Sequence, residues 1–460
     1  MSMTTDLRDK DRRFLWHPYT QMKDYEDRDL LLVDRAEGLF LYDADGNRYY
    51  DTVSSWWCIV HGHNHPTIKA AVRDQMERLE QVLLAGVSHA PAILLAEKLV
   101  QLTPPALTRV FYSDNGSTAC EIAVKMSLQY WQQSGQPARR QFIGLERGYH
   151  GDTIGTMSLG GTPGFHGPFA ELLFHTHRLP SPYCYRCPMG QEKKTCDLEC
   201  LIPLKTLLDK EGDHIAALII EPLIQAAGGM IVYPARYLTR AAAMLHAAGA
   251  HLILDEVATG FGRTGTMFAL EQAKVTPDFL CLSKGLTAGY LPMAATLTTE
   301  AVFQAFYADY AENRTFQHGH TFSGNPLAAA AGLASLEVFA EEQTLARLTD
   351  TVPYLHARLT RFLDLPWVGD LRRLGMICAL ELVKNKATRE PFSVADRVGW
   401  RIYLAGLGQG LILRPLGNVV YLWLPLSATR ADIDEITDRA WTVLADPALF
   451  PGMQRSDVHD

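Results

Sequence analysis

Three features that the sequence lacks narrow what the protein can be. It has no run of basic residues, and 43 Lys and Arg against 51 Asp and Glu give a formal net charge of −8 at pH 7. This balance argues against nucleic acid or an anionic membrane surface as the main partner. No apolar stretch approaches the ~20 residues that a membrane helix needs. Residues 1–13 lack the apolar core of a signal peptide, so we expect a cytoplasmic protein.

Internal repeats and low-complexity tracts are also missing. The 460 residues, 47% of them hydrophobic, are enough for two or three domains with large cores. The chain has eight cysteines. In a cytoplasmic protein we expect these as free thiols or metal ligands rather than as a disulfide framework.

Between residues 66 and 330, short apolar stretches alternate with helical patterns. This alternation predicts a mainly parallel sheet with helices on both faces. The expected strands are 109–112, 141–145, 216–220, 251–254 and 279–282.

Two further hairpins are predicted near the chain ends, at 39–50 and 411–424, with a helix at 327–339 and a strand at 376–382. We therefore predict an α/β fold with a large domain at 66–330. A smaller α/β domain would combine an N-terminal segment, 1–65, with residues 331–460.

Two charged residues stand at the carboxyl ends of predicted strands. Asp255 ends the stretch 251–255, and Lys284 follows 279–282. Such strand ends meet at the ligand crevice of an open α/β sheet, so we predict that both residues share one pocket. A buried lysine suits a nucleophile or Schiff base, and an aspartate facing it suits the pyridinium nitrogen of pyridoxal phosphate. A solvated lysine at the start of a loop is the alternative.

A phosphate site is predicted where Gly116 and Ser117 lie between a strand and a helix. Backbone amides, a hydroxyl and the positive helix end would face the phosphate there, although many similar turns bind nothing. Tyr149 follows the next strand and could stack on a planar cofactor. Val257 would cover the opposite face of that cofactor.

Gly260, Gly262 and Gly265 fit the G-x-G-x-x-G pattern of dinucleotide-binding folds. That fold needs a helix directly after the glycines and an acidic residue at the end of the next strand. Asp278 precedes the next strand instead, so we reject a dinucleotide site.

Two histidine clusters, at 61–65 and 318–320, lack helical spacing and a clear carboxylate companion, so we expect no metal there. Cys184, Cys187, Cys196 and Cys200 are harder to interpret. Their paired spacing is similar to that of a small zinc loop, and a structural metal, a disulfide and free thiols all stay open. Nothing places them in the catalytic pocket.

Taken together, these residues resemble the class III, fold-type I pyridoxal phosphate aminotransferases. Residues 254–265, followed by Ser283, Lys284 and Gly285, are similar to the signature of that family. Further strings resemble the branch of the family that acts on 8-amino-7-oxononanoate in biotin synthesis. These strings are residues 16–20, 54–57, 61–66, 148–153, 318–322 and 414–417.

The resemblance implies a role for each cofactor-binding residue. Lys284 would bind the cofactor's aldehyde and move the substrate proton, and Asp255 would keep the pyridine nitrogen protonated. Gly116 and Ser117 would bind the phosphate, and Tyr149 would stack on the ring. The family also implies a homodimer, in which His320 and Thr321 complete the phosphate site of the neighbouring subunit.

For the substrates, the resemblance implies that Arg414 binds a carboxylate in a bidentate pair. Tyr19, Trp56 and Trp57 would wall the site, with Tyr19 also among the catalytic residues, although ordinary core packing is the alternative for the tryptophans. The substrate-binding set then comprises Tyr19, Trp56, Trp57, Tyr149, Lys284, Gly319 and Arg414.

The activity implied is amino transfer to 8-amino-7-oxononanoate, giving 7,8-diaminononanoate. S-adenosylmethionine is the expected amino donor, and lysine is the alternative donor. Two other readings stay open: a different class III ω-aminotransferase, acting on a diamine or on a substrate like 4-aminobutyrate, and a cofactor- or metal-binding protein without turnover.

Overall fold

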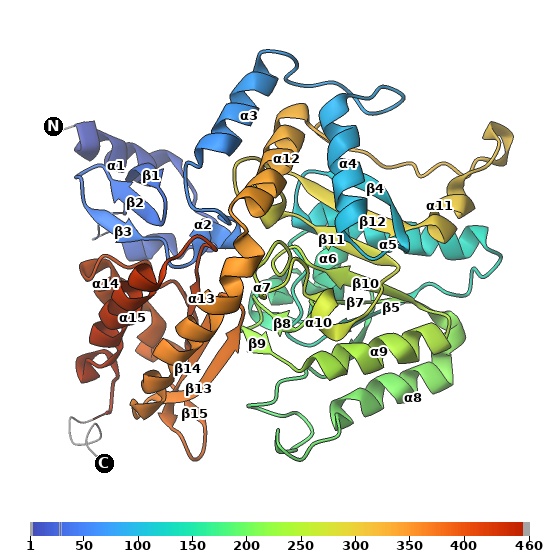
Figure 1. Ribbon diagram of the computed structural model, residues 1–460. Coiled ribbons are helices and arrows are strands. Elements are labelled where there is room, and N and C mark those ends of the chain that lie inside the picture. Colours follow the sequence, from blue (N-terminus) through green and yellow to red (C-terminus); the bar gives the residue numbers. More distant parts are fainter. Residues whose placement is uncertain (1–2, 27, 29, 454–460) are drawn as a thin grey trace.

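The computed structural model of the chain describes residues 3–26, 28 and 30–453. Its largest sheet has seven strands in the order β4-β12-β11-β10-β7-β5-β6 (Figure 1). The strands are β4 (Leu107–Ser113), β5 (Gln141–Leu145), β6 (His177–Leu179), β7 (Ile215–Ile220), β10 (His251–Asp255), β11 (Phe279–Leu282) and β12 (Ala294–Thr299). All run parallel except β12, which is antiparallel to β11 and β4. The mainly parallel sheet predicted from the sequence is confirmed.

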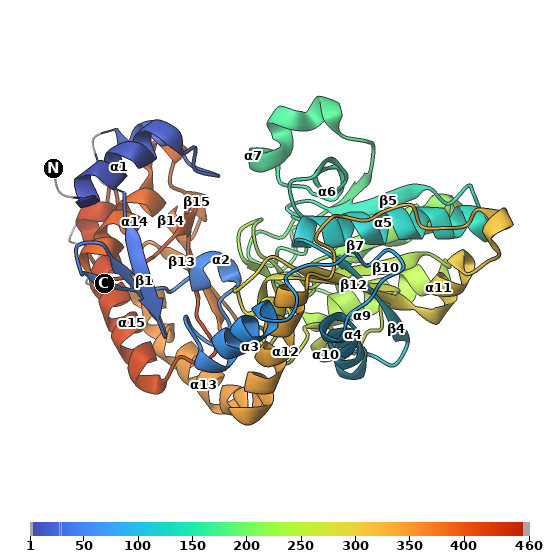
Figure 2. The same cartoon turned by 90° about the horizontal axis from the view of Figure 1, so that it is seen from above.

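Helices cover both faces of this sheet (Figure 2). Helix α5 (Gly116–Gln133) lies on one face, and α4 (Ala90–Leu102) and α9 (Ala235–Ala247) lie on the other. Every residue of β7, β10 and β11 is buried as a result, which explains why β7 and β11 are entirely apolar and why β10 is apolar between His251 and Asp255. The first polar residues after the strands therefore stand at the sheet edge, where they can reach a ligand.

A five-stranded antiparallel sheet forms from the C-terminal part of the chain. Its strands are β13 (Val368–Leu374), β14 (Ile377–Asn385), β15 (Glu390–Pro391), β16 (Pro415–Leu416) and β17 (Val419–Trp423). Helices α14 (Val398–Gly408) and α15 (Arg430–Leu444) pack together beside it. The predicted hairpin at 411–424 is present as β16 and β17.

The N-terminal sheet lies next to this C-terminal part, at the left of Figure 1. It consists of β1 (Val33–Glu37), β2 (Phe40–Asp43) and β3 (Arg48–Tyr50), and β2 and β3 form the hairpin predicted at 39–50. Tyr50 joins the two regions directly: its amide donates to the Gly410 carbonyl at 2.8 Å, and its carbonyl accepts from the Ile412 amide at 3.1 Å. Segments that are far apart in the sequence are thus held together by backbone hydrogen bonds.

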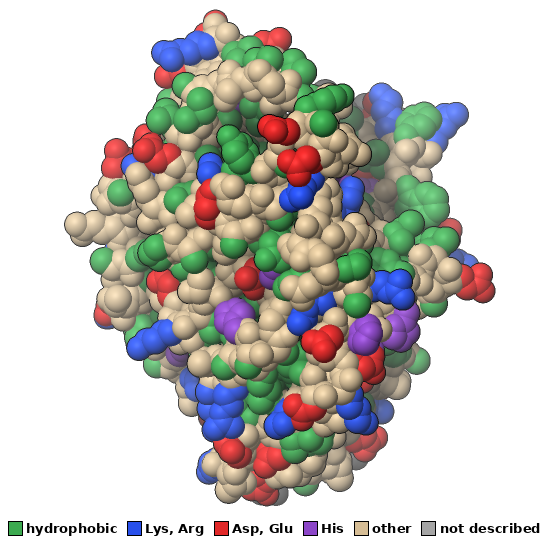
Figure 3. All heavy atoms as spheres, turned by 90° about the vertical axis from the view of Figure 1, so that its right-hand side faces the viewer, with side chains coloured by type: hydrophobic (Ala, Val, Ile, Leu, Met, Phe, Trp, Pro, Cys, Tyr) green, Lys and Arg blue, Asp and Glu red, His purple; other side chains and the backbone are tan. Residues whose placement is uncertain are grey.

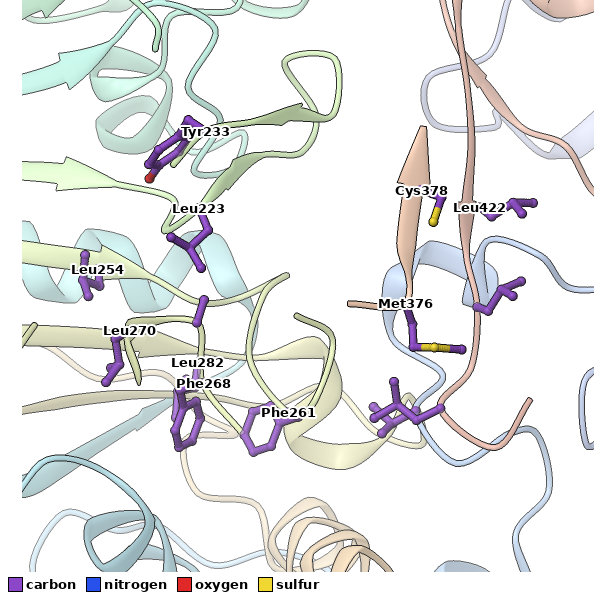
Figure 4. Packing of buried hydrophobic residues seen from close by; sticks show 14 of the residues in the cluster. Leu223, Tyr233, Leu254, Phe261, Phe268, Leu270, Leu282, Met376, Cys378 and Leu422 are labelled. Atoms are coloured by element: carbon purple, nitrogen blue, oxygen red, sulfur yellow. The ribbon is translucent and has the colours of Figure 1, made fainter. Parts of the chain in front are cut away.

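One hydrophobic cluster extends from the seven-stranded sheet to the five-stranded sheet (Figure 4). Phe261 and Leu282 belong to the large-sheet side of the cluster, and Met376, Cys378 and Leu422 belong to the other. Burying a side chain of this size contributes roughly 1.5–3 kcal/mol. The shared core therefore fixes the position of one sheet relative to the other.

The surface agrees with the composition. On the face drawn in Figure 3, acidic and basic side chains are intermixed rather than gathered into one patch of a single sign. Within the described part of the chain, none of the helices has the length and apolar character needed to span a bilayer.

Candidate active site

The main cavity has a volume of about 670 Å³ and lies at the carboxyl ends of the parallel strands. Asp255 ends β10, Lys284 follows β11, and Glu221 follows β7, and all three line the cavity. The ligand crevice of an open α/β sheet is found at this edge. The structure therefore brings Asp255 and Lys284 into one pocket, as the sequence predicts.

Lys284 sits where the chain leaves β11, with a left-handed backbone conformation (φ 43°). Its Nζ lies 4.7 Å from the centre of the Trp57 indole ring. Burial lowers the pKa of Lys284, and the negative charge of Asp255 opposes that shift only in part. A lysine with a lowered pKa holds more of its amine in the neutral, nucleophilic form.

Asp255 is only 4% exposed and is held by two hydrogen bonds. The Nδ1–H of the buried His150 donates to its Oδ2 at 2.7 Å, and the Val257 amide donates to its Oδ1 at 3.1 Å. These bonds fix the carboxylate at the floor of the cavity. A carboxylate in this position can accept a hydrogen bond from the protonated ring nitrogen of a bound cofactor.

The start of α5 forms a close-fitting cradle. A Cβ added at Gly116 would lie 2.4 Å from a methyl group of Val257, so the glycine is required by space. Ser117 Oγ hydrogen-bonds with Thr153 Oγ1 at 2.7 Å and Thr156 Oγ1 at 2.9 Å. Backbone amides, hydroxyls and the helix N-terminus meet here, which suits a phosphate group.

Tyr19, Tyr149 and Asp152 form a hydrogen-bonded cluster at the cavity. The Tyr19 hydroxyl donates to Asp152 Oδ2 at 2.6 Å, and the Tyr149 hydroxyl donates to the same oxygen at 2.8 Å. Burial and then the bond to Asp152 raise the pKa of Tyr19 to about 12. Burial opposes ionisation of Asp152, but the nearby His166, 3.8 Å away, and the hydrogen bonds from both tyrosines outweigh it and lower the pKa of Asp152. The cluster therefore places a fixed negative charge beside two phenols.

The paired tryptophans take different positions. Trp56 is 40% exposed and its ring lies 4.6 Å from the Arg414 guanidinium carbon, whereas Trp57 is 4% exposed. Trp57 stacks on Trp423 with ring centres 4.8 Å apart, and its Nε1 donates to Tyr421. Trp57 thus does both things that the sequence leaves open: it packs in the core and lines the cavity.

Arg414 stands between aromatic side chains, and it has no carboxylate within 4.0 Å among the residues that the structure describes. Its positive charge acts against the burial that raises the pKa of Tyr19 and Tyr421. A half-buried guanidinium without an acidic partner can bind an external carboxylate through two parallel N–H···O bonds.

The segment with Gly319, His320 and Thr321 lies outside the cavity lining of its own chain. His320 Nδ1 is 2.7 Å from Oδ2 of Asp114, which does line the cavity, while Gly319 and Thr321 are exposed. The Gln81 side chain donates to the Thr321 carbonyl at 2.7 Å. Within one chain, the pair of His320 with Asp114 connects this segment to the rim of the site.

The prediction that the two histidine clusters lack a carboxylate companion is wrong. His63 pairs with Asp51 at 2.9 Å, His65 pairs with Glu342 at 3.0 Å, and His320 pairs with Asp114, so these histidines do have carboxylate companions. Each pair involves a different carboxylate, and the pairs tie separate turns together.

The four cysteines of the loop lie away from the main cavity, around a small cavity of their own. Burial and then the neighbouring Cys184, Cys187 and Cys196 raise the pKa of the Cys200 thiol to about 12. The structure thus gathers all four cysteines at one place and keeps them out of the catalytic pocket.

The sequence does not predict a role for three residues of the site: His150, Asp152 and Glu221. His150 and Asp152 stand beside Tyr149 in the string 148–152, which was the available signal. Glu221 is buried and accepts hydrogen bonds from the amides of Ala226 and Tyr149, at 2.9 and 3.1 Å. Burial and then the charge of Asp255 raise the pKa of Glu221 to about 8.

We expect the protein to lose stability as pH rises toward the pKa of Glu221. In an unfolded chain the pKa of a glutamate is ~4.3, so the folded state holds the extra proton between that value and about 8. The free energy of unfolding should therefore fall by up to ~1.4 kcal/mol per pH unit in this window. Glu221→Gln is a neutral match of the protonated acid and should remove this contribution.

The measurement is urea unfolding of both proteins without cofactor at about pH 5.5, 7 and 8.5. Burial also raises the pKa of Glu256 to about 7. Glu256 is present in both proteins and contributes equally to the pH dependence of their stability. Identical pH dependence in the two proteins would contradict the raised pKa of Glu221.

Comparison with known proteins agrees with this geometry. The family model Aminotransferase class-III matches residues 22–444. The adenosylmethionine-8-amino-7-oxononanoate aminotransferase of Geobacter sulfurreducens is 47% identical over 95% of this chain and 96% of its own. The Methanocaldococcus jannaschii protein of the same name is 41% identical over the full length of both chains.

Solved structures give the same picture. The crystal structure of the Methanocaldococcus jannaschii protein has a TM-score of 0.91 at 40% sequence identity, covering 96% of this chain and 99% of its own. A PLP-bound amine transaminase from an uncultivated Pseudomonas species has a TM-score of 0.90 at 35% identity, covering 94% and 98%. With a family match across 22–444 and relatives of this identity over nearly all its length, the chain belongs to the class III aminotransferase family.

Proposed function

We propose that this protein is a cytoplasmic, pyridoxal phosphate-dependent aminotransferase that converts 8-amino-7-oxononanoate to 7,8-diaminononanoate in biotin synthesis, with S-adenosylmethionine as amino donor. One observation carries the proposal: Lys284, Asp255 and Ser117 all line the same cavity. Relatives named for this reaction match the chain at 47% and 46% identity over 95% of its length, which supports the choice of substrate.

The residues present fit the cofactor. Gly116 and Ser117 would hold the phosphate, Asp255 would face the ring nitrogen, and Val257 and Tyr149 would cover the ring. The close contact of Gly116 with Val257 supports this assignment. A Cβ at position 116 would collide with Val257, so only glycine lets the start of α5 approach Val257. When bound, pyridoxal phosphate supplies an electron-withdrawing ring and an aldehyde that weaken the Cα–H bond of an attached amine.

Lys284 is the residue that would bind the aldehyde and then move the proton. Burial lowers the pKa of Lys284 and so favours the neutral amine that both tasks require, and the Trp57 ring covers the amine on one side. His150 and Val257 hold Asp255 in place, so its charge would face the ring nitrogen without rearrangement.

The substrate side of the site suits a carboxylate at the end of an aliphatic chain. Arg414 would bind the carboxylate, and Trp56 would lie along the methylene groups. Tyr19, anchored by Asp152, would contact the substrate near the reacting centre. Lysine in place of S-adenosylmethionine is the alternative donor. Solved ω-transaminases match the chain at 31–32% identity, lower than the relatives named for 8-amino-7-oxononanoate.

We also propose a homodimer in which Gly319, His320 and Thr321 reach the cavity of the partner subunit. Two observations support it. Gly319 and Thr321 are exposed in the single chain although His320 stands at the rim of the site. Apolar side chains are exposed on and near α4 and on the same loop, as a subunit interface would need, including Ile93 at 56% and Phe322 at 61%.

Arg414→Ala tests the proposed substrate. If Arg414 binds the substrate carboxylate, the half-reaction with 8-amino-7-oxononanoate should weaken by roughly 2–5 kcal/mol, as for truncation of one partner of a buried charge pair. Arg414→Lys should recover only part of this, because a point charge cannot form the bidentate pair. We would follow both half-reactions by single-turnover absorbance with S-adenosylmethionine and with lysine as donors.

The matched control is Arg401→Ala, an exposed arginine on α14 that bonds only to the Asp396 carbonyl among the described residues. It should leave both half-reactions unchanged. An unimpaired rate with the keto substrate in Arg414→Ala would remove Arg414 from the site. Turnover of a diamine but not of 8-amino-7-oxononanoate by the unmodified protein would overturn the proposed function itself.

A further inference from the structure

The loop that follows β6 is unusual in having no regular structure of its own. Between Leu179 and Glu199 the chain forms no helix and no strand. A stretch of this length without helix or strand is uncommon in a compact domain unless something cross-links it or it serves a function. The loop belongs neither to the cofactor site nor to the substrate site described above.

All four cysteines of this loop, Cys184, Cys187, Cys196 and Cys200, line one small cavity. Its volume is about 20 Å³, which is room for one monatomic ion and too little for an organic ligand. The four thiols are free. Their spacing along the chain, two residues between the first pair and three between the second, is that of paired metal ligands.

The surroundings of this cavity suit a negatively charged metal–thiolate centre. Arg236, on α9, donates to the Cys196 carbonyl at 2.8 Å and approaches Cys196 Sγ at 3.9 Å. Lys193 lines the same cavity. Such outer groups orient the ligands of a metal and offset the charge of four thiolates around a divalent ion.

We propose that Cys184, Cys187, Cys196 and Cys200 bind one structural zinc ion per chain. Four thiolates are a tetrahedral donor set typical of zinc, and no open position is left for a catalytic water. Binding must draw the sulfurs inward. Zinc–sulfur bonds of ~2.3 Å place tetrahedral sulfurs ~3.8 Å apart, whereas no three of these four described sulfurs all lie within 4.8 Å of one another. The four thiol protons leave to solvent as the zinc–sulfur bonds form.

The zinc would stabilise a bridge between the two sheets. Next to Cys184, the Tyr183 hydroxyl donates to Glu381 of β14, and Arg186 Nε donates to the same carboxylate at 2.5 Å. Arg389, beside β15, donates to the Tyr185 carbonyl at 2.5 Å. Residues 183–186 are thus hydrogen-bonded to the five-stranded sheet. The zinc would hold the same residues against α9.

The test is metal analysis of the full-length holoenzyme, produced in zinc-supplemented medium and freed of loosely bound metal. We expect one zinc per chain. Replacement by Co²⁺ should give the visible absorption bands and the sulfur-to-metal charge-transfer band of a tetrahedral thiolate site. Cys187→Ser and Cys196→Ser should each lower the zinc content at least about tenfold.

Cys378→Ala is the matched control, since it removes a buried thiol of β14 outside the loop, and it should keep one zinc per chain. Trypsin gives a second readout on the unmodified protein. The exposed Lys193 and Lys194 should be cut rapidly after chelation and slowly with zinc bound. Zinc below about one-tenth per chain would overturn the proposal, as would disulfides among the four cysteines or iron in place of zinc. Because the unmodified protein gives these results, a variant that fails to fold does not affect them.

Discussion

Lys284→Ala is expected to abolish turnover while leaving the fold intact. The side chain is the one amine that lines the cavity among the described residues, and burial has already lowered its pKa. In the role proposed for Lys284, its removal takes away both the group that would bind the aldehyde and the group that would move the proton. Proton transfer alone contributes ~10²–10⁴-fold, so we expect a loss of about 10³-fold or more in kcat.

The measurement combines steady-state rates with the absorbance spectrum of the purified variant. Phosphate and ring contacts remain, so the variant should still bind pyridoxal phosphate, but with the spectrum of the free aldehyde instead of that of a lysine adduct. Lys205→Ala, on α8 (Ile202–Glu211), removes an exposed lysine and should change neither property. Near-normal activity in Lys284→Ala would show that another group does this chemistry.

Asp255→Asn is expected to have the second largest effect. A neutral amide cannot hold the proton of a pyridinium nitrogen, and the lost charge-assisted hydrogen bond is worth about 1.5–3 kcal/mol in cofactor binding. The step that removes the Cα proton should lose more, because there the ring must accept negative charge. The bond from His150 can persist to the amide oxygen, so the fold should survive.

The cofactor affinity and kcat of Asp255→Asn can be compared with those of Asp278→Asn. Asp278 accepts from the Leu252 amide at 2.8 Å at the opposite end of β10, far along the strand from the cavity, and its replacement should leave catalysis unchanged. If Asp255→Asn keeps the spectrum and rate of the unmodified protein, another residue faces the ring nitrogen.

The sequence predicts the strands of the large sheet well, and the reason is burial. Strands such as β7 and β10 are covered by helices on both faces, so their sequences are continuously apolar and end abruptly at polar residues. Asp255 and Lys284 stand at such ends, and the structure places them in one cavity. Two strands of this sheet are not predicted from the sequence. The reversed strand β12, at 294–299, mixes alanine and threonine with little apolar signal, and β6 has only three residues, His177–Leu179.

Contacts between distant segments could not be predicted. Asp255 and His150 are 105 positions apart, and Glu221 and Tyr149 are 72 positions apart, so no local pattern records either bond. The two tryptophans show the same limit. Positive φ angles at Ser54, Ser55 and Trp57 send adjacent rings in different directions, which residue types alone do not reveal. The domain boundaries at 65/66 and 330/331 stay a prediction.

The core that joins the two sheets has a consequence for selectivity. Lys284 comes from the seven-stranded sheet, whereas Arg414 directly precedes β16 of the five-stranded sheet, and the packing of Phe261 and Met376 between the sheets keeps them apart by a fixed amount. In the roles proposed for Lys284 and Arg414, the reacting carbon and the carboxylate of a substrate would have to match that separation. The protein would then select keto acids by chain length as well as by charge, and substitutions in the core, far from any substrate atom, should change which homologue fits.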